Sequence, residues 1–223
     1  MNENDNLFAP RFTIKDVTIH KKERIFKRYF AIDRYLVSYK RFDGTESRIV
    51  DREIFERDSD AVAVLAWDKK TDEIALIEQF RPGALKDEKS PWLIEIVAGI
   101  IDPGETRVQA AIREVKEEIG LTLTEKQLHY VTSDYPTPGG ASELVTLYIA
   151  DADLSNLEKH GGLDVESEDI RVFKASLKDA YENVKNGRIH NSVAIIAIQH
   201  LLLEKESILK SFAKYLLKIL SFL

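Results

Sequence analysis

A short predicted helix with three clustered glutamates, between two glycines, is the feature that most constrains this chain. The segment 99–121 reads GIIDPGETRVQAAIREVKEEIGL. Thr106, followed three residues later by Gln109, predicts a capping box at the start of a helix. Gly120 predicts where that helix ends. Apolar residues recur between these points at helical spacing and predict one buried stripe: Val108, Ile112, Val115 and Ile119.

Three glutamates of this predicted helix lie close together. At about 100° per residue, Glu114, Glu117 and Glu118 fall within an arc of roughly 100° beside the apolar stripe. Like charges at this spacing repel one another, so protein stability alone does not favour them. A divalent cation would remove the repulsion, and a ligand set made only of oxygen suits Mg²⁺ or Mn²⁺. The alternative interpretation of three such glutamates is a solvated acidic helix face.

The whole segment resembles the Nudix box. The pattern of that box is Gly-x5-Glu-x7-Arg-Glu-U-x-Glu-Glu-x-Gly-U, where U is aliphatic, and this chain satisfies every specified position. The match includes Glu105 ahead of the helix and Arg113 beside Glu114, and it favours a metal site over an acidic face. The resemblance implies hydrolysis of a nucleoside diphosphate linked to another group.

Outside the box, the chain resembles the bacterial ADP-ribose pyrophosphatases from about residue 28 to about residue 205. The stretches that carry this resemblance are REIFER at 52–57, LIEQFR at 76–81, EIVAGI at 95–100, PGGASE at 138–143 and ESEDI at 166–170. The resemblance implies hydrolysis of ADP-ribose to AMP and ribose 5-phosphate. It also implies two or three Mg²⁺ ions per site, with Mn²⁺ as the alternative cation.

The resemblance assigns substrate contacts to both halves of the chain. Tyr29 and Phe30 match positions that contact the adenine. Arg52, Arg57 and Arg81 are candidates to hold the diphosphate or ribose, because a guanidinium fork fits phosphate oxygens. Ordinary strand packing and surface ion pairs are the alternatives for these five. The other implied contacts are Glu53, Ile100, Thr137, Pro138, Gly139 and Glu143.

The resemblance also distributes the catalytic roles. The metal ligands would be Glu114, Glu118 and the backbone carbonyl of Ala98, with Glu117 as a further ligand or a support. Arg113 would orient a box glutamate. The general base would come from a loop, where Glu166 matches the base and Glu168 matches an acidic residue that helps bind metal. Gly161-Gly162 could serve as the hinge of that loop. The alternative is that Glu166 and Glu168 belong to a solvated acidic run.

The fold class that we expect is α/β (α+β), with a mixed sheet between helices, because strands and helices alternate after Ala61. We expect strands at 61–67, 73–80, 92–98, 127–133, 143–150 and 170–173, a loop at 157–168, and helices at 177–187 and 191–221. Residues 1–57 read as a small antiparallel β-domain, 58–206 as the hydrolase domain and 207–223 as a C-terminal extension. The first of these is too short for a robust core of its own, so we expect a homodimer.

Composition narrows the function further. The net charge is −6 and the main body shows no basic stripe, which disfavours nucleic-acid binding. There is no cysteine, which excludes disulfides and thiolate chemistry. Together with the lack of a signal-like N-terminus, this favours the cytoplasm. In the extension, Lys210, Lys214 and Lys218 recur every four residues. We expect that helix to pack on its own body or on a dimer partner, with membrane-surface docking as the alternative.

Two rival functions stay open. Hydrolases of GDP-mannose and other nucleoside diphosphate sugars share the architecture and the Pro-Gly-Gly loop, although the motif from Arg52 to Arg57 favours ADP-ribose. Some Nudix domains are ligand sensors without activity. These usually lack box glutamates and carry a DNA-binding extension, and this chain shows neither feature.

Overall fold

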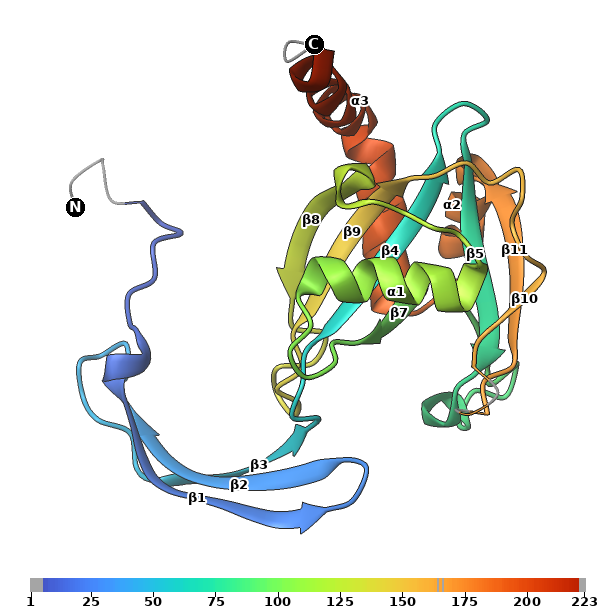
Figure 1. Ribbon diagram of the computed structural model, residues 1–223. Coiled ribbons are helices and arrows are strands. Elements are labelled where there is room, and N and C mark those ends of the chain that lie inside the picture. The colour runs from blue at the N-terminus through green and yellow to red at the C-terminus, as the bar shows by residue number, and fades with distance from the viewer. Residues whose placement is uncertain (1–5, 164, 166, 221–223) are drawn as a thin grey trace. The chain divides into compact units, whose positions relative to one another are not determined.

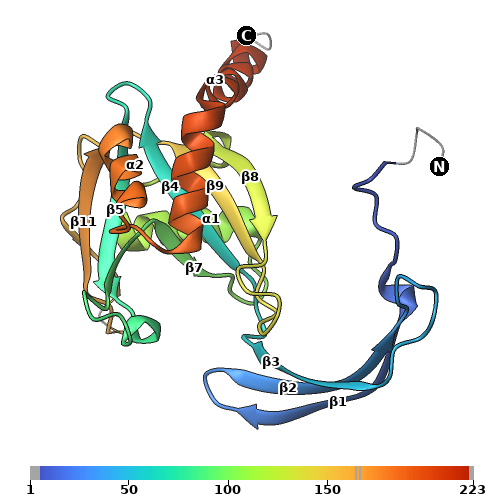
Figure 2. The ribbon, with the colours of Figure 1, turned by 180° about the vertical axis from the view of Figure 1, so that it is seen from behind.

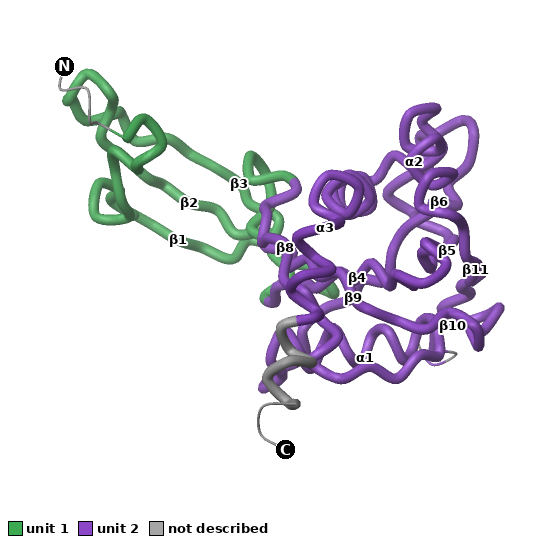
Figure 3. Tube along the Cα trace, turned by 90° about the horizontal axis from the view of Figure 1, so that it is seen from above, with its two compact units in different colours: residues 1–58, 137–143 green, residues 59–136, 144–223 purple. Residues whose placement is uncertain are grey.

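The computed structural model describes residues 6–163, 165 and 167–220, with side chains as far as Ala213. The chain divides into two compact units, which Figure 3 shows in different colours. The smaller unit consists of residues 1–58 together with the loop 137–143. The larger unit consists of residues 59–136 and 144–223. The loop 137–143, which the sequence placed within the hydrolase domain, is therefore part of the smaller unit.

The smaller unit is an antiparallel sheet of three strands in the order β1-β2-β3, as expected. The strands are β1 (Val17–Lys27), β2 (Ala31–Tyr39) and β3 (Val50–Glu56), preceded by the 3-10 helix η1 (Ile14–Asp16). Almost all of β1 is exposed, including Ile19, Ile25 and Phe26. A buried carboxylate, Asp33, ties the hairpin together by accepting hydrogen bonds from Arg24.

The larger unit is built on a mixed sheet of eight strands. Its main path runs β10-β11-β5-β4-β9-β8, with β6 paired to β5 and β7 paired to β4. Only β4 and β9 run parallel. The bounds are β4 (Ala61–Asp68), β5 (Glu73–Phe80), β6 (Trp92–Glu95), β7 (Val97–Ile100), β8 (Leu128–Asp134), β9 (Val145–Asp151), β10 (His160–Gly161) and β11 (Ile170–Ser176).

Helices cover both faces of this sheet. Helix α1 (Arg107–Ile119) lies on one face (Figure 1), whereas α2 (Leu177–Lys185) and α3 (Ser192–Leu220) lie on the other (Figure 2). Two short 3-10 helices, η2 (Pro82–Ala84) and η3 (Glu125–Gln127), complete the unit. The predicted arrangement of a mixed sheet between helices is confirmed.

The continuous apolar run of β4 is explained by these two layers. Successive residues of a strand point to opposite faces. Leu65 and Trp67 accordingly join the core under α2 and α3, and Val64 and Ala66 join the core under α1. Every residue of β4 is buried. A strand buried on both faces needs apolar residues throughout.

The expectation of a single strand over 92–98 is wrong. The chain forms β6, breaks at the buried Ile96, and continues as β7. The reason lies in β4 and β5, which pair only where Trp67 meets Ile74 and Asp68 meets Glu73. Beyond these pairs the two strands diverge, and the chain crosses from β5 to β4. The loop expected over 157–168 also contains a short strand, β10.

Helix α1 follows its predicted signals closely. The side chain of Thr106 accepts from the N–H of Gln109, and Gly120 ends the helix with a left-handed φ of 74°. Val115 and Ile119 are fully buried, as the stripe predicts, while Val108 and Ile112 are only partly buried. Their place in the core is taken by two residues that the stripe did not include, Ala110 and Ala111.

The last helix, α3, departs from helical geometry at Glu204. Beyond that residue Ile208 and Phe212 are buried, and Ser211 hydrogen-bonds His129 of β8 at 2.8 Å. The described part of the extension therefore packs on the body of its own unit. The lysine pattern continues at 214 and 218, whose side chains lie outside the described residues. Among the described residues, no helix is long and apolar enough to cross a membrane.

Candidate active site

Arg113 is the central residue of an ion-pair network on the inner face of α1, the face toward the sheet. Its guanidinium donates to Glu105 at 2.9 and 3.0 Å, to Glu114 at 2.7 Å and to Glu117 at 3.0 Å. It also donates to the carbonyl oxygen of Ile100 in β7 at 3.0 Å. Arg113 thereby links three carboxylates of the box to the sheet.

Glu114 is held against the sheet by a glycine. The carboxyl group of Glu114 lies so close to the α-carbon of Gly99 that any Cβ at residue 99 would overlap it. Burial raises the pKa of Glu114 to about 6 against the opposing effect of Arg113, and the nearby charges of Glu117 and Glu168 add to the increase. The first glycine of the box is therefore needed for the approach of this carboxylate.

Glu118 is the most deeply buried carboxylate of the helix, with 2% of its surface exposed. Its direct hydrogen-bond donor is the backbone N–H of Ala98, at 3.2 Å from Oε2. Burial raises its pKa well above the usual range, and the negative charges of Glu114 and Glu168 raise it further. A buried charge without a cationic partner is costly, so Glu118 needs a positive group that the arginine network does not supply.

Arg81 approaches these carboxylates from the end of β5. Its Nε and Nη2 lie 2.9 and 2.8 Å from Oε2 of Glu95 in β6. The same oxygen accepts from Nε2 of the buried Gln79 at 3.2 Å. Burial acts to lower the pKa of Arg81, but the charges of Glu95, Glu118 and Glu168 outweigh burial and raise it. One arginine therefore lies within electrostatic reach of the acidic cluster formed by Glu114, Glu118 and Glu168.

The loop before β11 brings Glu168 to this cluster. The N–H of Leu163 donates to the Glu168 carboxylate at 3.4 Å, and the N–H of Glu168 donates to the Leu163 carbonyl at 3.3 Å. Gly161 pairs with Ile170, and Gly162 donates to the Glu117 carbonyl at 3.1 Å. The two glycines that could form a hinge are thus tied to β11 and α1. The candidate base, at position 166, lies outside the described residues.

The residues of the acidic cluster fit a hard divalent cation in their chemistry. All donors are oxygens, the charges repel, and Glu118 is buried without a cationic hydrogen-bond partner. Such donors suit Mg²⁺ or Mn²⁺. Among the described residues, no three acidic or histidine side chains converge on a common point as a finished metal cage. Arg113 instead holds Glu114 and Glu117.

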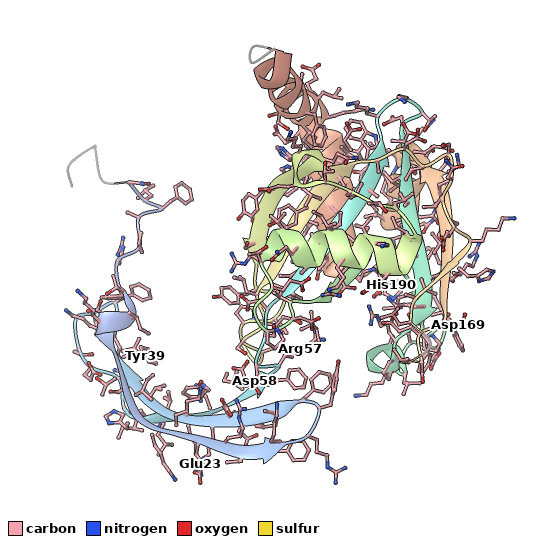
Figure 4. All side chains as sticks on the ribbon, in the orientation of Figure 1. Glu23, Tyr39, Arg57, Asp58, Asp169 and His190 are labelled. Carbon is pink, nitrogen blue, oxygen red and sulfur yellow. The ribbon has the colours of Figure 1, made fainter. Side chains whose placement is uncertain are left out.

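A second group of candidate residues gathers within the smaller unit. The ring of Phe30 packs on those of Tyr29 and Phe55, with centroids 4.7 and 4.6 Å apart. Arg57, which follows β3 (Figure 4), lies over Phe30 at 5.6 Å and pairs with Glu143. The loop 137–143 joins this group because the N–H of Phe55 donates to the carbonyl of Gly140. That loop carries the exposed candidates Thr137, Pro138 and Gly139.

The two remaining candidates, Arg52 and Glu53, point to opposite faces of the small sheet. They are consecutive residues of β3, and side chains alternate along a strand. Glu53 shares the face of Phe55, whereas Arg52 shares that of its register partner Tyr35. Both are exposed, and Arg52 donates only to the carbonyl of Asp51. Within one chain, Arg52 is therefore not brought together with Phe30.

Sequence reasoning did not single out Glu95 or Gln79. Both lie in stretches that carried the resemblance, but neither had a signal of its own. The available signal was alternation: Gln79 of β5 and Arg81, which directly follows the strand, are two residues apart and so point to the same face. The facing strand therefore had to supply a carboxylate for the arginine. Finding that carboxylate required the pairing of β5 with β6, which matches Ile77 to Glu95.

The buried charge of Glu118 leads to a prediction about stability. A carboxyl group whose pKa is raised on folding binds its proton more tightly in the folded state. The stability of the metal-free protein therefore falls as pH rises through the ordinary glutamate range toward the raised pKa. Glu118→Gln should remove this loss and increase the free energy of unfolding at pH 7 by on the order of 1–3 kcal/mol. Urea unfolding between pH 4 and pH 8 measures it.

The matched control is Glu117→Gln, on the same turn of α1. Glu117 is more exposed and pairs with Arg113, so its replacement should cost stability instead of adding it. Equal effects of the two substitutions, or a loss of stability in Glu118→Gln with a gain in Glu117→Gln, would contradict the assignment of an uncompensated charge to Glu118.

Comparison with known proteins identifies the family to which this chain belongs. Residues 57–191 match the family model of the NUDIX domain. The chain is 38% identical to an ADP-ribose pyrophosphatase of Escherichia coli (strain K12) over 209 residues, which cover 94% of this chain and 98% of that one. It is 32% identical over 206 residues to one of Haemophilus influenzae, covering 91% and 94%. It is 31% identical over 187 residues to a GDP-mannose pyrophosphatase of Cronobacter sakazakii, covering 83% and 95%. This chain belongs to the Nudix family, and it is a Nudix pyrophosphohydrolase.

Proposed function

We propose that this chain hydrolyses the diphosphate of ADP-ribose to AMP and ribose 5-phosphate with the help of Mg²⁺. The observation that carries the proposal is the acidic cluster of the buried Glu118 with the partly buried Glu114 and Glu168, beside Arg81. An excess of carboxylates attracts cations, and the cations together with an arginine attract a diphosphate. The names of the relatives at 32–38% identity support ADP-ribose as the substrate.

In this proposal, Glu114, Glu118 and the carbonyl oxygen of Ala98 would hold Mg²⁺, with Glu117 and Glu168 as further ligands. Two or three ions per site are proposed, with Mn²⁺ as a substitute. A bound cation would neutralise diphosphate charge and lower the pKa of a water molecule. Arg113 contributes by holding Glu114 and Glu117 in place, which keeps their oxygens on the sheet side of α1.

Arg81 would bind oxygens of the diphosphate through the part of its guanidinium that Glu95 leaves free. In the smaller unit, Tyr29 and Phe30 would stack on the adenine. Stacking of an aromatic ring on a base is worth about 1–3 kcal/mol in single-strand binders. Arg57, Glu53 and Glu143 would contribute polar contacts there, together with the loop Thr137-Pro138-Gly139. Ile100 would make a packing contact to the substrate.

The proton of the attacking water would pass to the carboxylate of Glu166, and the water oxygen would bond to the adenosyl phosphorus. AMP and ribose 5-phosphate then separate when the bridging P–O bond breaks. The described neighbour Glu168 supports this arrangement, because its charge reaches Glu114 and Glu118. The same loop can therefore supply one carboxylate to the cation and another to the water.

We also propose a homodimer in the cytoplasm. Support for the dimer comes from β1, whose exposed Ile19, Ile25 and Phe26 leave a sheet of three strands with little core. A second copy that covered this surface would bury it. Arg52, which faces away from Phe30, would then be free to contact a neighbouring subunit. The cytoplasmic location is supported by a composition without cysteine.

A substrate panel tests the proposed reaction. Purified protein with Mg²⁺ is offered ADP-ribose, GDP-mannose, NADH and diadenosine polyphosphates, and the products are separated by chromatography. ADP-ribose should give the highest kcat/KM, with AMP and ribose 5-phosphate in equal amounts. A higher kcat/KM for GDP-mannose would contradict ADP-ribose as the substrate and favour GDP-mannose. Lack of turnover of all four would favour a sensing module.

A pair of loop variants tests the division of roles. Glu166→Gln should lower kcat by about 10²–10⁴-fold, as expected when a general base is lost, with little change in the Mg²⁺ concentration needed. Glu168→Gln should mainly raise that concentration. Steady-state kinetics across a Mg²⁺ series separates the two effects. An unchanged kcat in Glu166→Gln would exclude Glu166 as the base. A larger loss of kcat in Glu168→Gln than in Glu166→Gln would make Glu168 the base and Glu166 the metal ligand.

A further inference from the structure

We propose that Glu95 is a positioning residue, which clamps one edge of the Arg81 guanidinium and so reserves the rest of it for the substrate's diphosphate. The inference rests on the proposed function and concerns the same site. Glu95 belongs to β6, and Arg81 follows the end of β5, so the pair spans two neighbouring strands. Its role would be to act through Arg81 without touching the substrate.

The geometry of the pair supports a clamp. Nε and Nη2 of Arg81 both lie within 2.9 Å of a single oxygen of Glu95, Oε2. Use of this edge fixes the plane of the guanidinium, because Nε is attached to the side chain. No described residue accepts a hydrogen bond from Nη1. The opposite end of the fork is therefore available for the paired oxygens of a diphosphate.

Glu95 is itself held in place. Its side chain is 13% exposed, and Nε2 of the buried Gln79 donates to the same Oε2 at 3.2 Å. Gln79 and Arg81 lie on the same face of their segment, since alternate residues of a strand share a face. The carboxylate thus receives donors from two neighbouring side chains of one strand. A carboxylate restrained by its own partners can restrain the arginine that it binds.

The clamp also has an electrostatic consequence. Arg81 lies within electrostatic reach of Glu118 and Glu168, in addition to Glu95. An arginine without Glu95 would be drawn to Glu118 or Glu168 and would compete there with the divalent cation. Pairing with Glu95 keeps Arg81 beside the acidic cluster without occupying it. Loss of the clamp should therefore affect the use of both diphosphate and Mg²⁺.

Glu95→Gln tests the inference, because it removes the charge and keeps the shape. We expect KM for ADP-ribose and the activating Mg²⁺ concentration each to rise roughly tenfold, with a smaller change in kcat. Glu95→Asp keeps the charge and should recover part of the loss. The matched control is Glu78→Gln, which breaks an equally sheltered ion pair with Arg188 on the other face of β5 and should leave both constants unchanged.

A double-mutant cycle shows whether Glu95 acts through Arg81. The variant Arg81→Ala with Glu95→Gln should be no worse than Arg81→Ala alone, because the clamp then has nothing to hold. Effects that multiply would overturn the inference, as would wild-type constants in Glu95→Gln. A readout without substrate is solvent exchange of the Arg81 Nε–H by NMR, which should be slow in wild type and fast in Glu95→Gln. Equal exchange rates would contradict the clamp.

Failure of the proposed function would look different from failure of this inference. If wild type hydrolyses GDP-mannose in place of ADP-ribose, the same variants are compared on GDP-mannose, because both substrates present a diphosphate. If wild type hydrolyses neither, the exchange of the Arg81 Nε–H still decides whether Glu95 holds the arginine.

Discussion

Repulsion among carboxylates on the inner face of α1 is the constraint on which the rest of the larger unit depends. Arg113 compensates the outer part of this charge by binding Glu105, Glu114 and Glu117. It does not bind Glu118, which is buried and which, among the described residues, receives one hydrogen bond, from the backbone N–H of Ala98. Folding therefore leaves one carboxylate buried at a cost that the charge of Arg81 offsets only in part. A divalent cation bound beside Glu118 would compensate its charge, and the free energy gained in this way would favour binding of the cation.

Because β4 and β5 diverge, the sheet divides into two branches, and each branch carries residues of the candidate site. One branch, β5 with β6, carries Arg81, Gln79 and Glu95. The other branch, β4 with β7, carries Gly99 and Ala98 against α1. The chain passes from one branch to the other at the buried Ile96. The proposed arginine clamp and the proposed cation site are thus linked by a few residues of backbone.

Local signals predicted a large part of this structure. The capping residue Thr106, the terminal Gly120 and the apolar spacing within α1 act over a few residues, so the sequence displays them directly. The continuous apolar run from Ala61 likewise predicts a strand buried on both faces. Helical spacing likewise predicts that Glu114, Glu117 and Glu118 lie at the edge of the core, although it does not show that Glu118 is fully buried.

What the sequence did not show depends on contacts between distant segments. The break at Ile96 follows from the divergence of β4 and β5, which no local pattern encodes. The pairing of Glu95 with Arg81 needs the register of β6 on β5. The loop containing Pro138 joins the smaller unit through hydrogen bonds to Phe55. In addition, the separation of Arg52 from Phe30 appears only once β3 is placed beside β2.

The central claim is that burial and the nearby negative charges raise the pKa values of Glu114 and Glu118, and that a bound cation relieves this. Titration of the metal-free protein with Mg²⁺ in a calorimeter, in buffers of different ionisation enthalpy, tests it most directly. Because burial raises the pKa of Glu114 to about 6 and that of Glu118 well above the usual glutamate range, binding near pH 6 should release protons. The double variant Glu114→Gln with Glu118→Gln should lose both the binding and the release. Binding without proton release, or unchanged binding in the double variant, would contradict the account.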